Sequence, residues 1–340
     1  MNLAAQISRA AERAPLPDTL LRYGISRMVG RTQALLASSQ ARTSHFAYDM
    51  AAHPIAEHTQ AANRQHYELP PAFFAQCLGP RRKYSCGLFE GGDTLAQAEE
   101  RALEQTIAHA QLRDGQRILE LGCGWGSLTL FMAERFPAAM ITAVSNSAPQ
   151  RLYIEAQARR LRLNNIRVIT ADMNDFVTME TFDRIVSVEM FEHMANWRGL
   201  LTRVRCWLAP GAKLFLHVFS HASHPYRFAH EDEADWIAQY FFTGGIMPSH
   251  DLIREFGDLF RVEQGWRWNG GHYEQTALAW LANYDANQAA IRPILRETYG
   301  GEAKLWQRRW RLFFLATAGL FGHAGGKAWG VSHYLLQPCS

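Results

Sequence analysis

Short apolar runs alternate with amphipathic stretches through the middle of the chain. Apolar runs with the length of buried strands lie at residues 116–121, 140–144, 166–170, 182–188 and 213–219. Between them, residues 126–136, 149–161 and 197–208 have the spacing of helices. Strands that alternate with helices of this length predict a parallel sheet covered on both faces. We therefore expect an α/β fold with a doubly wound, mostly parallel sheet.

Helical patterns flank this alternation on both sides. Residues 3–62 are rich in Ala, Gln and Arg, with one break at Pro15 and Pro17, and another helix is expected from about Thr94 to Gln111. After residue 219 the pattern predicts helices at 229–242, 273–290 and 303–321 and strands at 261–268 and 331–336. We expect residues 1–65 to be an N-terminal helical extension. Residues 66–340 would form the main domain, with helical insertions at about 220–260 and 285–325 that cover the site.

One N-terminal stretch has an apolar stripe. Its members recur at near-helical spacing: Leu20, Leu21, Gly24, Ile25, Met28 and Val29. Arg22, Arg27 and Arg31 take other faces. The stripe favours a helix packed on the main domain, although a basic amphipathic helix can also lie on a membrane surface. The apolar run at residues 312–321 is far shorter than the roughly 20 residues of a membrane span.

Composition and charge narrow the class of protein. The 340 residues are 48% hydrophobic and 20% charged, as in globular proteins, and the formal charge of +3 gives no strong field for nucleic acid. Five scattered cysteines form no C-x-x-C pair, which indicates reduced thiols and neither a disulfide framework nor a metal site. Charges at Arg9, Glu12 and Arg13 interrupt any signal-type apolar core, so a cytoplasmic location is expected. The sequence leaves the oligomeric state open.

A glycine-rich loop follows the first strand and opens a helix, where a doubly wound sheet binds its cofactor. It contains Gly122, Gly124 and Gly126, preceded by Glu120. Glycines there let the chain turn sharply and let the backbone approach a ligand. The G-x-G-x-G spacing differs from the G-x-G-x-x-G of dinucleotide binders, so a pyrophosphate is not expected. Glu120 could hold a charged aminocarboxylate end.

Polar residues follow the next two strands. Dinucleotide sites place an acidic residue about 20 positions after the loop to hold the ribose. Here Asn146 and Gln150 occupy that region, and their amides can bond ribose hydroxyls. Asp172 and Met173 follow the third strand and would flank an adenine, the carboxylate accepting from its amine and the thioether packing on the ring.

Several motifs, taken in order, resemble the cyclopropane-fatty-acid synthase family of methyltransferases. They are Tyr84-Ser85-Cys86, the glycine loop, Glu189-Met190-Phe191-Glu192-His193-Met194, Tyr240-Phe241-Phe242-Thr243-Gly244-Gly245, Gly271-His272-Tyr273 and Val331-Ser332-His333-Tyr334. The match is strongest with the coclaurine N-methyltransferase branch and extends from about His66 to the C-terminus. It implies a seven-stranded class I methyltransferase fold with S-adenosylmethionine as donor. Tyr84, Ser85, Glu120, the three glycines, Asn146, Gln150, Asp172 and Met173 would hold that donor.

The resemblance implies one of two chemistries. In the cyclopropane synthases a bicarbonate is held at the positions that correspond here to Cys86, Glu192, His217, Phe219 and Tyr273, and Phe219 replaces a smaller aliphatic residue. The synthases have glycine where this chain has Glu189. The amine methyltransferases have the paired glutamates and the following histidine, as this chain does. The resemblance therefore favours a small-molecule amine as acceptor, with unsaturated phospholipid chains, and a bicarbonate cofactor, as the alternative.

The acidic cluster suits amine chemistry. Glu189, Glu192 and His193 follow the fourth strand, at the carboxyl edge where such sheets bind ligands. An alkylammonium must lose a proton before its nitrogen can attack a sulfonium. We assign Glu192 and His193 to proton removal and Glu189 to holding the ammonium. Cys86, His217, Phe219, Tyr240, Tyr273 and Trp329 are the candidates that line the acceptor pocket.

Two other classes of protein remain as hypotheses. A protein that binds the donor without catalysis would have no use for the acidic cluster and the histidine. A dinucleotide oxidoreductase is disfavoured by the glycine spacing and by the absence of an acidic residue at the ribose position. Both hypotheses are therefore weaker than a methyltransferase.

Overall fold

The computed structural model describes residues 12, 14, 16–57, 69–228 and 236–339. Its central sheet has seven strands in the order β3-β2-β1-β4-β5-β9-β8. The parallel strands are β1 (Arg117–Leu121), β2 (Met140–Ser145), β3 (Ile166–Thr170), β4 (Phe182–Val188) and β5 (Leu208–His221). Strands β8 (Phe260–Asn269) and β9 (Trp329–Pro338) add an antiparallel edge. The predicted doubly wound, mostly parallel sheet is confirmed.

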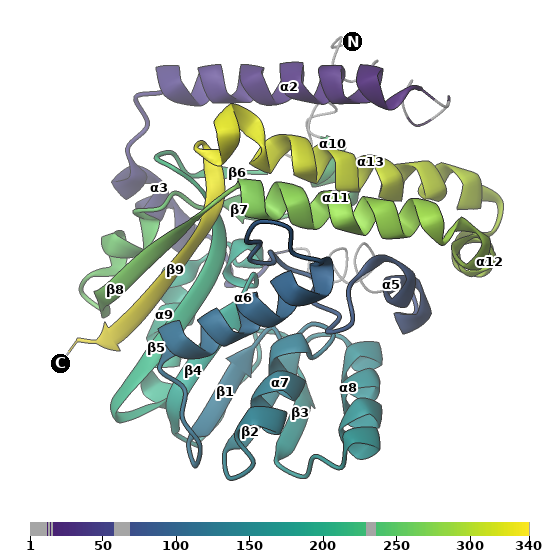
Figure 1. The fold of residues 1–340 in the computed structure, drawn as a ribbon. Helices are drawn as coiled ribbons and strands as arrows, with labels where there is room; N and C mark the ends of the chain where they lie inside the picture. Colours follow the sequence, from purple (N-terminus) through teal and green to yellow (C-terminus); the bar gives the residue numbers. More distant parts are fainter. Residues whose placement is uncertain (1–11, 13, 15, 58–68, 229–235, 340) are drawn as a thin grey trace.

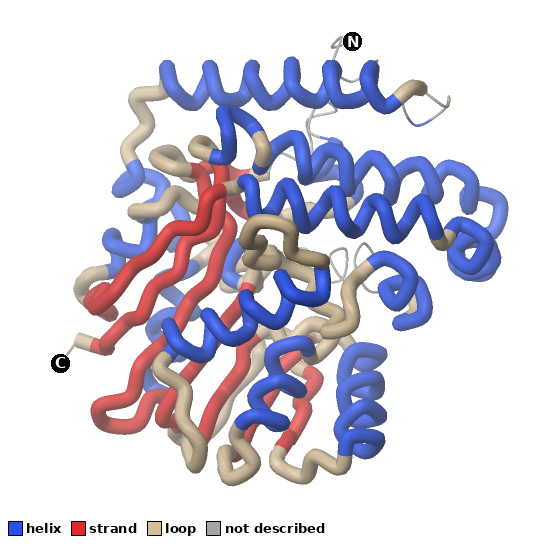
Figure 2. Tube along the Cα trace, viewed as in Figure 1, coloured by secondary structure: helices blue, strands red, loops and turns tan. Residues whose placement is uncertain are grey.

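Successive strand residues are buried on opposite faces of the sheet. Leu119 and Ile185 belong to one apolar cluster, whereas their neighbours Ile118 and Val186 belong to another. Helix α9 (Trp197–Trp207) contributes to the first cluster. Helices α6 (Leu95–Ala110) and α7 (Ser127–Arg135) contribute to the second. Helices lie on both faces of the sheet (Figure 2), and most residues of β1, β2 and β4 are buried.

Helix boundaries in the central region follow capping chemistry. Thr94 and Gln97 form a capping box at the start of α6, and Gln111 ends that helix in the left-handed conformation. Helix α8 (Ala148–Leu161) begins after Ser147, whose side chain accepts a hydrogen bond from the amide of Gln150. The predicted bounds of these helices are therefore close to those observed.

A helical roof lies beyond the carboxyl ends of the parallel strands (Figure 1). It contains α5 (Pro71–Cys77), α10 (Trp236–Tyr240), α11 (Gly271–Ala286), α12 (Gln288–Tyr299) and α13 (Ala303–Phe321). The single helix predicted at residues 273–290 is wrong, because Asn287 leaves the helical region and separates α11 from α12. Of the helix predicted at residues 229–242, residues 229–235 lie outside the described part of the chain. Its described part forms only α10.

The N-terminal helix α2 (Asp18–Ser38) begins directly after Pro17 and lies against α13 (Figure 1). Ile25 packs so close to α13 that a Cβ on Gly319 would lie 2.4 Å from its side chain. Leu21 and Val29 also face the roof, whereas Leu20 is exposed. Helix α3 (Thr43–Asp49) follows. Residues 58–68, which include the predicted domain boundary, lie outside the described residues, as do residues 1–11 of the predicted N-terminal helix.

Within the described residues, no helix is both long enough and apolar enough to cross a membrane.

Candidate functional site

All three loop glycines have a positive φ, but a Cβ added at each of them would meet different neighbours. A Cβ on Gly126 would lie 2.6 Å from the side chain of Ile154, and one on Gly122 would lie 2.5 Å from that of Met190. A Cβ on Gly124 would meet no described atom within 4 Å. The missing Cβ at Gly124 leaves open space, whereas the missing Cβ at Gly122 and at Gly126 allows close packing within the protein. Gly122 also lines the cavity described below.

One cavity gathers most of the residues predicted to hold the donor. It is lined by Tyr84, Ser85, Glu120, Gly122, Gly124, Asn146, Gln150, Asp172 and Met173. Gly126 is not among the lining residues, because it packs behind the loop on Ile154. The cavity lies at the carboxyl ends of β1, β2, β3 and β4, as expected for a doubly wound sheet.

Buried polar atoms on the cavity wall lack partners among the described residues. They are Nε1 of Trp125, Oγ of Ser127 and Nε2 of Gln150. The Oε1 atom of Gln150 is held by a 2.6 Å hydrogen bond from Ser145, so its amide nitrogen is oriented but has no acceptor. Buried donors are nearly always hydrogen-bonded in folded proteins. A nucleoside with ribose hydroxyls and ring nitrogens supplies acceptors of the required kind.

Glu120 is buried at the end of β1 and accepts a 2.5 Å hydrogen bond from Oγ1 of Thr129. Burial raises the pKa of its carboxyl to about 7, and the Thr129 bond opposes this shift. A cationic group beside Glu120 would favour the ionised carboxylate. The charged aminocarboxylate end of a donor therefore suits this position.

Glu189 directly follows β4 and has a φ of +49°, a left-handed conformation that is uncommon for residues with a Cβ. Its amide donates a 2.8 Å hydrogen bond to the carbonyl of His217 on β5. The side chain lines the cavity and is only 7% exposed. This backbone geometry turns the carboxylate away from the strand and into the site.

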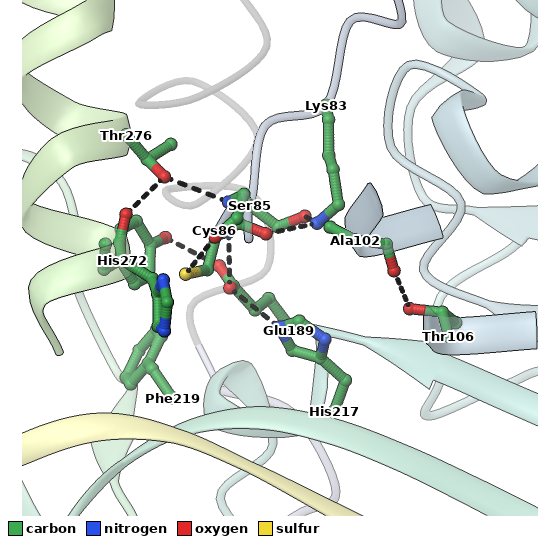
Figure 3. A network of polar contacts seen from close by, with 12 residues as sticks. Lys83, Ser85, Cys86, Ala102, Thr106, Glu189, His217, Phe219, His272 and Thr276 are labelled. Atoms are coloured by element: carbon green, nitrogen blue, oxygen red, sulfur yellow. Dashed lines mark hydrogen bonds and ion pairs between the residues drawn. The ribbon is translucent and has the colours of Figure 1, made fainter. Parts of the chain in front are cut away.

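Three donors converge on the Glu189 carboxylate (Figure 3). The amide of Cys86 donates to Oε1 at 2.9 Å, and Nε2 of His217 lies 3.2 Å from the same oxygen. The hydroxyl of Tyr273 on α11 donates to Oε2 at 2.7 Å. Because Nε2 of His217 faces a carboxylate, we place the ring proton on that nitrogen. The site thus holds one carboxylate with donors from three separate segments.

Lys83 is a buried cation beside this carboxylate (Figure 3). Its ammonium donates to Oγ of Ser85 at 2.6 Å and to the carbonyl of Cys86 at 2.7 Å. Burial raises the pKa of Glu189, and the charge of Lys83 is the main influence that opposes the rise. Burial likewise lowers the pKa of Lys83, opposed by Glu189. The two groups therefore stabilise each other's charged forms.

Glu192 lies behind the cavity wall. It is fully buried, its Oε1 accepts a 2.5 Å hydrogen bond from the amide of Phe219, and its Oε2 has no partner among the described residues. Burial, and then the charge of Glu189, raise the pKa of Glu192 well above its usual range. Glu189 has more donors and a nearby cation, so Glu192 is the protonated member of the pair.

His193 lines the cavity next to Glu189, and its ring stacks on Phe242 with centroids 4.8 Å apart. The predicted cluster is therefore divided. Glu189 and His193 face the cavity, and Glu192 does not.

The predicted pocket residues are also divided. Cys86, His217 and Tyr273 surround Glu189, and Phe219 holds Glu192. Tyr240 instead lies under the guanidinium of Arg309 at 3.8 Å, in the roof. The indole nitrogen of Trp329 donates to the hydroxyl of Tyr226 at 3.2 Å. None of the six predicted pocket residues is among the residues that line the cavity. Cys86, His217 and Tyr273 contact the Glu189 carboxylate, which does line it, whereas the contacts described for Tyr240 and Trp329 lie elsewhere, so the assignment of these two to the acceptor pocket stays a prediction.

Sequence reasoning missed Lys83, Trp125 and Ser127. Lys83 directly precedes the Tyr84-Ser85-Cys86 motif but ends a basic, turn-rich segment, which is usually solvated. Trp125 and Ser127 flank Gly126 and could have been found as side chains of the glycine loop. Among the described residues, no group of three or more His, Cys, Asp or Glu side chains could hold a metal ion.

Comparison with known proteins places the chain in a family. The family model for mycolic acid cyclopropane synthetase matches residues 56–324. The chain belongs to this family. It is 36% identical over 289 residues to (S)-coclaurine N-methyltransferase of Thalictrum flavum subsp. glaucum, covering 83% of this chain and 80% of the relative. It is 28% identical to cyclopropane-fatty-acyl-phospholipid synthase of Escherichia coli K12, covering 79% and 66%.

A solved structure in the family extends this similarity. The crystal structure of coclaurine N-methyltransferase bound to N-methylheliamine and SAH has a TM-score of 0.93 at 32% identity, and the match covers 98% of this chain and 99% of the other. The family model begins at residue 56, close to the expected start of the resemblance near His66, and the structural match also takes in most of the residues before it. The chain is an S-adenosylmethionine-dependent methyltransferase with a class I fold.

The position of the Glu189 carboxylate bears on whether this chain could bind the bicarbonate of the cyclopropane synthases. The resemblance assigns Cys86, His217 and Tyr273 to a bicarbonate ion in the synthases. Here those three residues are hydrogen-bonded to Glu189. A second anion among the same donors would face the repulsion of a buried carboxylate. The residues present therefore do not fit bicarbonate, because the chain supplies its own carboxylate.

Proposed function

We propose that the chain methylates the nitrogen of a small amine and that Glu189 is the carboxylate that meets the acceptor. The observation that carries this proposal is the Glu189 carboxylate at the cavity wall, held by three donors beside a buried lysine. A charged group at this depth is costly unless it serves a partner. A protonated amine is a partner of the right charge and size.

The chemistry requires little beyond positioning and one proton transfer. Glu189 accepts a hydrogen bond from the N–H of the acceptor ammonium and then takes that proton. The lone pair that is freed on the amine nitrogen points at the methyl group of the donor. His193, on the same wall, contacts the acceptor and shares in proton removal. The donor's sulfonium supplies the methyl group, and the electron pair of the broken C–S bond stays on sulfur. Holding both reactants in line accounts for much of the rate.

This assignment differs from the one drawn from sequence. Glu192, assigned there to proton removal, lies outside the cavity lining and is the protonated member of the acidic pair. A protonated carboxyl cannot accept the ammonium's proton. In our proposal Glu192 instead supports the amide of Phe219 and the turn that carries His193.

The relatives support an amine in preference to a lipid. Matches at 31–36% identity include (S)-coclaurine, pavine and (S)-tetrahydroprotoberberine N-methyltransferases. The cyclopropane synthase of Escherichia coli is a more distant relative at 28%. Together with the poor fit to bicarbonate, this favours nitrogen as the attacking atom.

The test is transfer of label from S-adenosylmethionine. The protein is incubated with (S)-coclaurine and with a panel of benzylic and alkyl amines, and separately with vesicles of unsaturated phospholipid plus bicarbonate. We expect labelled N-methyl products and no cyclopropane chains. Label found only in lipid would establish the alternative function. No label in any amine would overturn the proposal, provided that calorimetry shows donor binding.

A further inference from the structure

Glu99 is a buried carboxylate that no step of the proposed reaction uses. It lies on α6, and its exposed fraction is only 1%. Its Oε2 accepts a 2.9 Å hydrogen bond from the amide of Arg81, and its Oε1 accepts a 3.3 Å hydrogen bond from the amide of Lys83. A buried charge is costly unless it is paired and hydrogen-bonded. These two backbone donors therefore show that Glu99 binds the main chain of the segment that carries Lys83.

This segment bends so that its amides reach one carboxylate. The amide of Arg82 donates a 3.0 Å hydrogen bond to the carbonyl of Gly79, which closes a turn, and Arg82 has a φ of +55°. A Cβ on Gly79 would lie 2.5 Å from the Glu99 carboxylate, so the missing side chain allows the close approach. The turn therefore closes around the carboxylate of Glu99.

Helix α6 also holds the other end of the segment. The amide of Leu88 donates a 3.0 Å hydrogen bond to the carbonyl of Ala98, the residue before Glu99. Between the two anchors lies Cys86, whose amide donates to Glu189 at 2.9 Å and whose carbonyl accepts from the Lys83 ammonium at 2.7 Å. The position of both groups relative to Glu189 therefore depends on how α6 holds residues 79–88.

Two buried carboxylates stabilise the charge of Lys83. Burial lowers the pKa of Lys83, and the charges of Glu189 and Glu99 oppose this shift. Burial raises the pKa of Glu99, opposed first by the amide of Arg81 and then by the amide and the charge of Lys83. The other titratable groups that interact with Lys83 are neutral, namely the Cys86 thiol, His217 on β5 and His333 on β9.

We propose that Glu99 is a positioning residue that holds residues 79–83 and so keeps the Lys83 ammonium beside Glu189. This rests on the proposed function, in which Glu189 must be ionised to take the proton of the acceptor. Glu99 is not among the residues that line the cavity, so it contacts neither reactant. Its effect on catalysis passes through Lys83.

The experiment compares the pH profile of kcat/KM for the amine in full-length wild type and Glu99→Gln. A glutamine side chain has one acceptor oxygen and an NH₂ group that donates, so it cannot accept from both backbone amides, and it carries no charge. Lys83 then loses part of its support and the pKa of Glu189 rises. The acid limb should move to higher pH, by no more than it moves in Lys83→Met.

Glu100→Gln is the matched control. Glu100 is the next residue of α6 and binds the same segment, but through the guanidinium of Arg81, with Nε of Arg81 2.5 Å from its carboxylate. Arg81 also binds Glu134 on α7, so its side chain keeps one partner in this variant. The acid limb in Glu100→Gln should stay at the wild-type pH, and an equal shift in both variants would overturn the specific role of Glu99.

A double variant tests whether Glu99 acts through Lys83. When Glu99→Gln is combined with Lys83→Met, the acid limb should coincide with that of Lys83→Met alone, because the group through which Glu99 acts is already absent. An effect of Glu99 on the fold in general would instead add to the effect of Lys83→Met. Additive shifts would therefore overturn the proposal.

Gly79→Ala provides the test if Glu99→Gln does not fold. Its methyl group displaces the Glu99 carboxylate from the turn but leaves the charge in place, and the acid limb should again move to higher pH. An unchanged acid limb in Gly79→Ala and in folded Glu99→Gln, with amine methylation by wild type intact, would overturn the role of Glu99 alone. If wild type methylates no amine, the proposed function fails first and this inference fails with it.

Discussion

The amide of Cys86 donates a 2.9 Å hydrogen bond to the carboxylate of Glu189, 103 residues later in the chain. The bond ties the segment before α6 to the end of β4. Lys83, three residues before Cys86, holds the same segment through the Cys86 carbonyl. One short segment therefore both positions the carboxylate and supplies the cation that keeps it ionised.

Replacing Glu189 should remove methyl transfer and spare donor binding. In Glu189→Gln the side chain keeps its shape and can still accept hydrogen bonds, but it cannot take a proton. We expect kcat/KM for the amine to fall by about 100-fold or more, the usual range for a lost general base. The dissociation constant for S-adenosylmethionine, measured by calorimetry, should change little.

Glu192→Gln is the matched variant. Because Glu192 is protonated and outside the cavity, its amide isostere should keep most of the activity. If Glu192→Gln instead lost as much activity as Glu189→Gln, the direct role would have to return to Glu192.

Replacing Lys83 should shift the pH dependence of catalysis. The charge of Lys83 lowers the pKa of Glu189, so Lys83→Met should raise that pKa. The ionised form of Glu189 then appears only at higher pH, and the acid limb of the kcat/KM profile should move to higher pH. Lys213→Met, which removes a cation paired with Glu263 away from the site, is the control. An acid limb that shifts equally in both variants would contradict this role.

Much of the fold was predictable because local patterns and tertiary packing agree. The apolar runs that became β1, β2 and β4 are mostly buried, and their length and spacing from the helices predicted strands. The break at Asn287 was not predictable, since the apolar spacing continues across it. The grouping of the residues predicted to bind S-adenosylmethionine was also predictable, because the carboxyl ends of parallel strands share one edge of the sheet.

Residue types alone could not predict which glutamate of the acidic cluster faces the cavity. Glu189 and Glu192 are three residues apart, and only the left-handed backbone of Glu189 sends the first carboxylate into the cavity. Tyr240 and Trp329 were assigned to the pocket as aromatic residues near motifs, and the contacts described for both lie elsewhere. Side-chain direction depends on backbone conformation and tertiary contacts, which a residue list does not contain.

The raised pKa of Glu120 predicts a pH-dependent stability. The carboxyl titrates at about 7 in the folded protein and at 4.5 as its ordinary value. Between these values the folded protein holds a proton that the unfolded chain has lost, so the contribution of Glu120 to stability is most favourable below pH 4.5 and is lost as the pH rises through about 7. The side-chain oxygen in Glu120→Gln can still accept the hydrogen bond from Thr129, but this variant should lack this part of the pH dependence of the unfolding free energy. The difference in unfolding free energy between the two proteins, from urea titrations across this window, should change by up to about 3 kcal/mol.

Substitutions at two of the loop glycines should cause different defects, a loss of stability at Gly126 and a loss of donor binding at Gly124. Gly126→Ala places a Cβ 2.6 Å from Ile154 at a positive φ, so it should destabilise the fold by several kcal/mol, roughly the strain plus overpacking. Gly124→Ala meets no described atom, so only the left-handed backbone cost of about 1–2 kcal/mol applies to stability. Its methyl group instead projects into space at the cavity wall and should weaken donor binding by about tenfold, or about 1.4 kcal/mol.

Gly211→Ala isolates the backbone cost, because Gly211 has a φ of +75°, is exposed and has no atom near its would-be Cβ. Thermal unfolding and donor calorimetry on the three variants separate the two effects. Gly124 and Gly211 should lose similar stability, and only Gly124 should lose affinity. If Gly126→Ala weakened donor binding while keeping wild-type stability, that glycine would be a ligand contact, and the distinction between packing and ligand-facing glycines would be wrong.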